Sequence, residues 1–167
     1  MTHADLAVCV LSVLADDHRG AALRDDPGAH VAALVLACDG EYDDCVPVLA
    51  VLWAMESRFS FSPGSRHAFG PVQVLEVPGM TPTAREMRDD PVAGLRAGWA
   101  VWQAKSRRLF KGTAVPLNSA SRYSARLNSV ARAYNGHPRY RDRYGRTFAR
   151  MFGVVAKCRQ DNTEVER

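Results

Sequence analysis

The sequence predicts a mainly α-helical single domain with one short β-like segment around residues 61–80. The 167 residues suffice for one buried core, and no internal repeat or low-complexity linker divides them. Apolar residues recur at helical spacing along most of the chain. Proline and glycine instead concentrate between Phe61 and Met80. We therefore predict one domain over residues 1–158 and a disordered tail over residues 159–167.

Two apolar stripes predict helices before residue 43, with loops at His18–Gly20 and Asp26–Gly28. The stripes consist of Leu6, Val10, Val13 and Leu14, and of Val31, Leu34, Val35 and Cys38. The segment Met1–Leu14, which carries the first stripe, lacks the basic start of a secretory signal and contains Asp5. We interpret it as an amphipathic helix that belongs to the folded domain.

A third helix is predicted from about Asp44 to Phe59, with Pro47 tolerated in its first turn. Its buried face consists of Val48, Leu49, Leu52 and Met55. Glu56 follows Leu52 by four residues and so lies on this face or at its edge. Desolvation and the negative end of the helix dipole should both raise the pKa of this carboxyl group, as a general acid requires. The alternative is a salt bridge from Glu56 to Arg58 or Arg66 at a helix end.

The second half of the chain is predicted to contain a short extended piece, near Val72 and Val74, followed by three helices. The first helix starts after Asp89-Asp90-Pro91, a good helix start. Residues 111–121 are predicted to form a loop. The three helical stripes consist of Val92, Leu95, Trp99 and Trp102; of Tyr123, Leu127, Val130 and Tyr134; and of Tyr140, Tyr144, Phe148, Met151 or Phe152, and Val155.

Charge is unevenly distributed along the chain. Residues 1–56 hold ten acidic and two basic groups, a net charge of −8, and the remainder carries +12, which together give the chain's +4. This basic half would attract a polyanion, either nucleic acid or the carboxylate-bearing bacterial wall. No apolar run reaches the length of a membrane span.

Cysteines Cys9, Cys38, Cys45 and Cys158 lack metal-site spacing, so no metal or cofactor is predicted. Because Cys9 and Cys38 fall on apolar stripes, we predict free thiols, with a Cys38–Cys45 bridge as the alternative.

Four ordered elements between Val46 and Phe148 resemble the soluble lytic transglycosylase family, to which goose-type lysozyme and many phage lysins are related. Glu56-Ser57-Arg58-Phe59 resembles the family's E-S-x-F signature, and Ser65 keeps the family's spacing from the glutamate. Gly70-Pro71-Val72-Gln73 stands where the family has G-L-M-Q, and Asp90-Pro91 resembles its N-P-x-x-N-I segment. Ala133-Tyr134-Asn135-Gly136 matches its A-Y-N motif. Residues before about Asp43 carry no family motif and are expected to complete the core.

The resemblance implies a lysozyme-like fold and cleavage of the β-1,4 bond between N-acetylmuramic acid and N-acetylglucosamine in peptidoglycan. Glu56 would donate a proton to the leaving oxygen and then take one from the C6 hydroxyl, giving a 1,6-anhydro end. Ser57 would orient the N-acetyl group, while Ser65, Gly70 and Gln73 would line the sugar site. Tyr134 and Asn135 would face Glu56, with a core role for Tyr134 as the alternative.

Ser60-Phe61 and Glu76-Val77 depart from the family's residues at those places. A hydrolytic lysozyme, with Glu76 or an acid among Asp39–Asp44 holding the water, therefore remains an alternative.

Several aromatic side chains have two interpretations. At their helical spacing Trp99 and Trp102 are expected in the core, whereas Phe69 could either stack on a sugar or pack inside, and His67 is expected to be solvated. A basic helical module that binds nucleic acid is the rival from another class, because arginines and tyrosines interleave between Arg122 and Arg150. We expect a monomer that acts on the bacterial wall as a phage lysin, a virion component or a secretion-system accessory.

Overall fold

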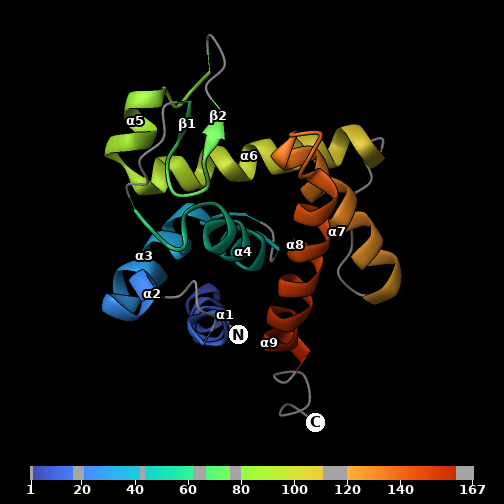
Figure 1. Ribbon diagram of the computed structural model, residues 1–167. Coiled ribbons are helices and arrows are strands. Elements are labelled where there is room, and N and C mark those ends of the chain that lie inside the picture. Colours follow the sequence, from blue (N-terminus) through green and yellow to red (C-terminus); the bar gives the residue numbers. More distant parts are fainter. Residues whose placement is uncertain are drawn as a thin grey trace.

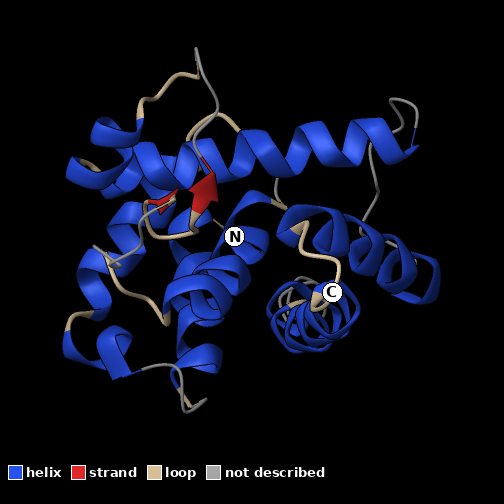
Figure 2. Cartoon of the chain, turned by 45° about the horizontal axis from the view of Figure 1, so that its top comes forward, coloured by secondary structure: helices blue, strands red, loops and turns tan. Residues whose placement is uncertain are grey.

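The computed structural model describes residues 2–16, 21–41, 44–61, 67–75, 80–110 and 120–160, and its described part is mainly helical, as the sequence predicts. Figures 1 and 2 show the helices gathered around α4, with a small antiparallel pair of strands on one side. The elements are α1 (His3–Ala15), α2 (Ala21–Asp25), α3 (Pro27–Ala37), α4 (Cys45–Ser57), β1 (Ala68–Phe69), β2 (Val74–Leu75), α5 (Ala84–Asp89), α6 (Pro91–Phe110), α7 (Ala120–Asn135), α8 (Arg141–Val155) and α9 (Lys157–Gln160).

Helix α4 is the central element of the core. It packs against α1, α3, α6 and α8, and every residue from Cys45 to Ala54 is buried. The sequence predicts one buried face, but neighbours on all sides bury the whole helix except its last turn. That last turn carries Met55, Glu56 and Ser57, all partly exposed.

Local capping explains where several helices begin. Thr2 and Asp5 form a capping box at the start of α1, which packs into the core as predicted. The predicted loop at Asp26–Gly28 is wrong, because Asp26 caps α3 and Pro27 is its first residue. The short helices α2 and α5 were not predicted, although Thr83 and Glu86 form a second capping box.

The turn between β1 and β2 packs into a shallow groove that two glycines form on α6. A Cβ atom on Gly98 would lie 2.2 Å from Cγ2 of Val72, and one on Gly94 would lie 2.8 Å from Cδ of Pro71. Gly70, at φ 71°, approaches Gly94 from the other side. These close approaches fix the position of residues 70–73, which resemble a family motif and contact the candidate site.

Helices α7 and α8 cross closely at Gly145. A Cβ atom there would lie 2.3 Å from Oδ1 of Asn128 and 2.5 Å from Cγ of Arg132. Asp142, one turn earlier on α8, accepts a salt bridge from Arg132 at 2.7 Å. Both contacts fix the rotation of α8, and with it the position of Tyr144.

All four cysteines are paired, so the prediction of free thiols is wrong. Cys38–Cys45 closes the loop before α4, and Cys9–Cys158 joins α1 to α9. Cys38, Cys45 and Cys158 are buried and Cys9 is partly buried, but helical spacing says nothing about which residues meet across the core.

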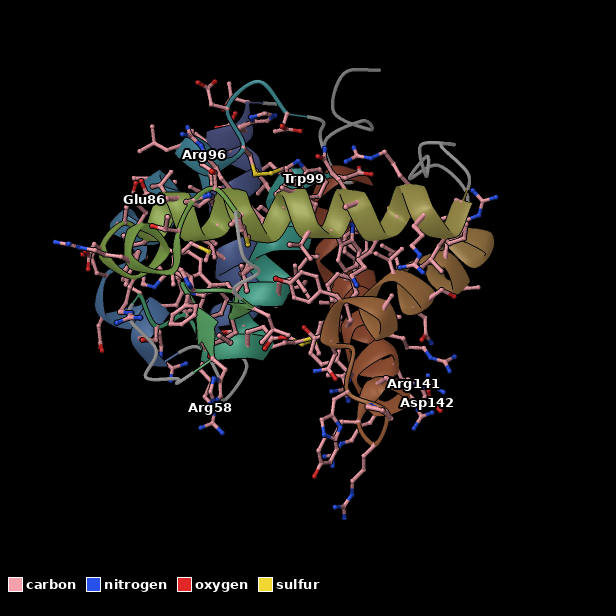
Figure 3. All side chains as sticks on the ribbon, turned by 90° about the horizontal axis from the view of Figure 1, so that it is seen from above. Arg58, Glu86, Arg96, Trp99, Arg141 and Asp142 are labelled. Carbon is pink, nitrogen blue, oxygen red and sulfur yellow. A yellow bond between two sulfur atoms is a disulfide. The ribbon has the colours of Figure 1, made fainter. Side chains whose placement is uncertain are left out.

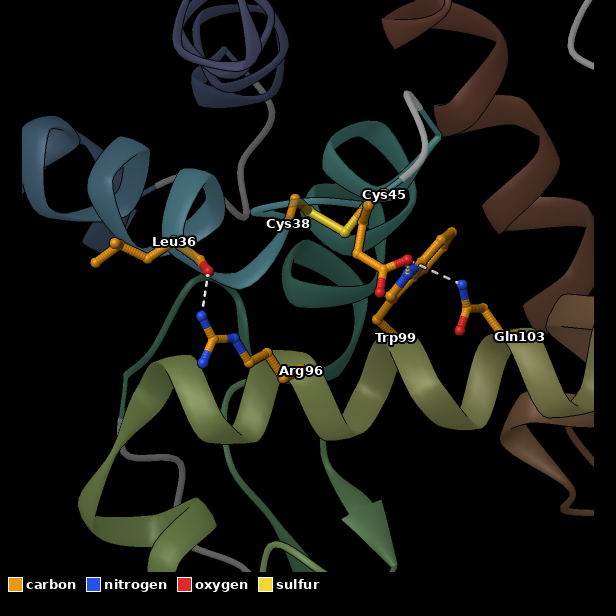
Figure 4. The surroundings of a disulfide bond; sticks show 7 residues. Leu36, Cys38, Cys45, Arg96, Trp99 and Gln103 are labelled. Atoms are coloured by element: carbon orange, nitrogen blue, oxygen red, sulfur yellow. Dashed lines mark hydrogen bonds between the residues drawn. A yellow bond between two sulfur atoms is a disulfide. The ribbon is translucent and has the colours of Figure 1, made fainter.

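The loop before α4 is held against α6. Glu41 accepts hydrogen bonds from Trp99 Nε1 at 2.7 Å and Gln103 Nε2 at 3.1 Å (Figure 4).

The last described helix, α9, extends to Gln160, so residues 159 and 160, predicted as the start of a tail, are helical. Residues 161–167 lie outside the described part of the chain. Of the described helices, none combines the length and apolar character that crossing a membrane requires.

Candidate active site

Glu56 lies in the last turn of α4, surrounded by apolar side chains on the same helix. Burial raises the pKa of its carboxyl group above the ordinary value of a glutamate, and a hydrogen bond from the Tyr144 hydroxyl to Oε1 offsets part of that rise. The C-terminal end of α4 is also the negative end of its dipole. A carboxyl group in this setting holds its proton to higher pH than an exposed one, as predicted from the sequence.

The salt bridge considered for Glu56 is not present among the described residues. Arg58 ends α4 in the left-handed conformation, at φ 53°, and its exposed side chain projects from the body of the protein (Figure 3). Arg66, the other candidate, lies outside the described residues. Within the described part of the chain the hydrogen-bond partner of the carboxyl group is therefore the neutral Tyr144 hydroxyl.

Tyr134 lies near Glu56 but bonds elsewhere. Burial and the negative charge of Glu56 raise its pKa well above the ordinary value of a tyrosine, so its phenol stays protonated. The hydroxyl donates to the backbone oxygen of Val72 at 2.9 Å, and the ring lies 6.2 Å from that of Trp102. Both interpretations of Tyr134 thus hold in part: it packs on the core and is close to the acid. The tyrosine that contacts the acid directly is Tyr144.

Ser57 connects the end of α4 to the turn on α6. Its hydroxyl lies 2.6 Å from the backbone oxygen of Pro71, and also 3.2 Å and 3.4 Å from those of Ser60 and Trp53. One hydroxyl proton serves one acceptor at a time, and Pro71 is the nearest. Ser57 thus holds the structure around Glu56 together, whereas its predicted contact with an N-acetyl group stays a prediction.

The other predicted site residues either make no described contact with Glu56 or lie outside the described residues. Gln73, at φ 52°, uses its amide to donate to Gly70 O at 3.1 Å and so closes the turn. Asn135 ends α7, where Oδ1 accepts a long 3.4 Å bond from His137 N. No described contact joins either residue to Glu56. Ser65 lies outside the described residues.

The burial of the aromatic side chains and of His67 tests the predictions made for them. Trp99 and Trp102 are buried in the core, as expected. Phe69 is also buried, with the Arg88 guanidinium 4.9 Å from its ring centre, so the sugar-stacking interpretation of Phe69 is wrong. His67 is exposed, as expected.

The acids proposed to hold a water for hydrolysis lie at the far end of α4. Asp44 precedes the helix and Glu56 lies twelve residues later, so roughly 18 Å of helix separates them. Glycosidases that use two carboxyl groups place them about 5–10 Å apart. Asp44 is therefore too far from Glu56 to act as its partner, and Asp43 and Glu76 lie outside the described residues.

Tyr144 is the residue that sequence reasoning missed. Its stripe on α8 is otherwise apolar, with Phe148, Met151, Phe152 and Val155 all buried. A hydroxyl on an apolar stripe needs a partner when it is buried, which is the same argument that singled out Glu56. The same argument could have marked Tyr144 as a candidate site residue, although not which residue it contacts.

No family model, no curated protein and no solved structure matches the chain. Among the described residues, no group of three or more histidine, cysteine, aspartate or glutamate side chains could hold a metal ion. The site consists of one carboxyl group with a raised pKa, the Tyr144 hydroxyl that donates to it, and the buried phenol of Tyr134 nearby.

Proposed function

We propose that the protein cleaves peptidoglycan glycan strands as a lytic transglycosylase of lysozyme-like fold, with Glu56 as its acid and base. The observation that carries the proposal is the raised pKa of Glu56, a partly buried carboxyl group at the end of a buried helix that accepts a hydrogen bond from Tyr144. A carboxyl group whose pKa is raised holds its proton to higher pH, which favours protonation of a glycosidic oxygen. The resemblance of residues 56–59, 70–73 and 133–136 to the family motifs supplies the substrate.

The arrangement favours a mechanism with one acid. Burial and Tyr144 set the pKa of Glu56, and no other carboxyl group among the described residues contributes to it. In a one-acid mechanism the substrate supplies the second function. The C6 hydroxyl of N-acetylmuramic acid attacks C1, Glu56 receives its proton, and no water is consumed. Tyr144 would stabilise the carboxylate that exists between the two proton transfers, because its hydroxyl already donates to that oxygen.

Mass analysis of muropeptides released from purified sacculi tests this proposal. We expect ends of 1,6-anhydro-N-acetylmuramic acid, which are lighter than hydrolysed ends by one water and unchanged by borohydride. Mainly reducible ends would instead indicate a hydrolytic lysozyme. Intact sacculi, together with steeply salt-dependent binding to DNA, would favour a nucleic-acid-binding module.

The exposed face of α8 supports an anionic partner. Arg143, Arg146 and Arg150 are exposed and recur on the side opposite Phe148 and its apolar neighbours. Figure 3 shows Arg141 and Asp142 at the periphery, where they lie 3.8 Å apart as an ion pair. We propose that this face holds the enzyme on the bacterial wall. The two disulfides support action in an oxidising compartment, where such bonds persist.

Wall binding can be tested separately from cleavage. Changing Arg143→Glu together with Arg146→Glu should weaken sedimentation with whole walls, and salt above ~0.15 M should weaken it in the parent, because charges on exposed arginines are screened. Cleavage of short soluble glycan fragments should be unaffected. Equal loss of both activities would mean that these arginines belong to the catalytic site or the fold.

A further inference from the structure

The backbone directly after Glu56 and Ser57 adopts an uncommon conformation. Arg58 and Phe59 follow in sequence with φ angles of 53° and 64°. Residues other than glycine rarely enter this left-handed region, and two in succession persist only where the surrounding structure holds them. Phe59 is fully buried, and the turn also carries Ser60, whose oxygen lies within reach of the Ser57 hydroxyl. Whatever holds this turn also holds the end of α4.

Side chains from two helices hold the turn through its carbonyl groups. Trp53 Nε1, on α4, donates to Ser60 O at 2.9 Å. His30, on α3, places Nε2 2.8 Å from Phe59 O. The second contact joins residues 29 positions apart in the chain. Through this contact α3, which carries no family motif, holds the turn next to the candidate site.

The other ring nitrogen of His30 also faces a backbone carbonyl group, with Nδ1 2.5 Å from Asp26 O. The ring therefore lies between the start of α3 and the turn after Ser57, with one nitrogen against a carbonyl group on each side. His30 is 1% exposed, so water does not compete for these contacts.

Aromatic side chains enclose the His30 ring. Its ring centre lies 4.4 Å from that of Phe61, 4.8 Å from that of Trp53 and 5.9 Å from that of Phe59. These contacts hold the ring in one position against the turn.

We propose that His30 is a positioning residue for the candidate active site. It ties the first turn of α3 to the strained turn after Ser57, and thereby fixes Glu56 relative to Tyr144 and to the substrate. The role in catalysis rests on the proposed function, whereas the effect on Glu56 does not.

The first experiment is nitrogen-15 NMR of the parent protein labelled at histidine. We expect a ring N–H of His30 to exchange slowly with solvent, because the ring is 1% exposed and its nitrogens face carbonyl groups. The exposed His67 and His137 should exchange fast and provide internal references in the same spectrum. Fast exchange at His30 would overturn the proposal, whether or not any variant folds.

The second experiment compares His30→Gln with the parent on soluble glycan fragments. An amide can donate to one carbonyl group but cannot span both. Because a displacement of ~1 Å can cost roughly 10²-fold in rate, we expect kcat to fall about tenfold or more while KM stays within about threefold. His3→Gln, the same change on the first turn of α1, should leave both constants unchanged. A folded His30→Gln protein with parental kcat would overturn the proposal.

A third measurement separates this inference from the proposed function. The carbon-13 signal of the Glu56 carboxyl group should move in His30→Gln and stay in place in His3→Gln. If the parent releases no muropeptides, the proposed function fails, and this signal still tests His30. A Glu56 signal identical in parent and His30→Gln would then overturn the positioning role.

Discussion

Replacing Glu56 with glutamine removes the transferable proton and changes little else. The two side chains have nearly the same shape, and the glutamine oxygen can still accept the bond from Tyr144. Loss of a general acid typically slows an enzyme by ~10²–10⁴-fold. This corresponds to about 3–5 kcal/mol of lost transition-state stabilisation, since each factor of ten is worth about 1.4 kcal/mol. We expect release of muropeptides from sacculi to fall by that factor, in a protein that still unfolds cooperatively.

The same substitution should change how stability depends on pH. The folded-state pKa of Glu56 is raised by burial, so the folded protein binds its proton more tightly than the unfolded chain. The contribution of the protonated carboxyl group is complete below the unfolded value of about 4.3, and it is lost as the pH rises through the folded pKa. Glutamine does not ionise. The melting temperature of Glu56→Gln should therefore rise relative to the parent as the pH increases across this interval.

Glu86→Gln is the matched control, because the shift there has the opposite sign. Hydrogen bonds from the Thr83 backbone and hydroxyl lower the pKa of the exposed Glu86. Its contribution is present above the unfolded value and lost as the pH falls through the folded one, so Glu86→Gln should cost stability at neutral pH and less in acid. Thermal unfolding of all three proteins from pH 3 to pH 8 measures both trends. A melting difference between Glu56→Gln and the parent that does not change with pH would refute the buried-acid argument, and muropeptide release within a few-fold of the parent would refute the catalytic one.

Three further predictions concern groups around the site. Tyr144→Phe removes the bond that stabilises the Glu56 carboxylate, so the pKa of Glu56 should rise and the alkaline limit of activity should move to higher pH, whereas Tyr140→Phe, an exposed change, should leave the pH–rate profile in place. Gly98→Ala should destabilise the protein by about 1–3 kcal/mol because its Cβ would clash with the motif turn, and Gly153→Ala, where nothing lies within 4 Å, should be neutral or stabilising in thermal melts. Reducing the disulfides with a dithiol should lower the melting temperature, since each native bridge typically contributes about 2–5 kcal/mol, and an unchanged melt would mean that the bridges are not formed.

Periodicity predicts the elements of this chain well where one face of a helix is buried. The stripes on α7 and α8 place Leu127, Val130 and Phe148 in the core, as found. Periodicity underestimates the burial of α4, because this helix is buried on every side and has no polar face to detect. It also misses α2 and α5, because five or six residues are too few for a periodic signal. The start of α5 was visible only in the capping chemistry of Thr83 and Glu86.

The candidate site is predictable in its acid but not in its contacts. Glu56 departs from an apolar pattern, which is a property of one helix and can be seen in sequence. The bond from Tyr144, the bond from Ser57 to Pro71 O and the two disulfides each join segments whose approach depends on the packing of the whole domain. Spacing along the chain carries no information about such approaches, so the prediction of free thiols failed although Cys38 was correctly placed on a buried face.

The N-terminal helices, which carry no motif, support the helix that carries Glu56. Helices α1 and α3 pack against α4, in which every residue from Cys45 to Ala54 is buried. Without this cover α4 would expose apolar side chains to water. Helix α3 also supplies His30, which contacts the turn after Ser57. The bridges Cys9–Cys158 and Cys38–Cys45 join these helices to the rest of the domain. We therefore expect the residues from Val46 onward not to fold on their own, because α4 would lose the neighbours that bury it.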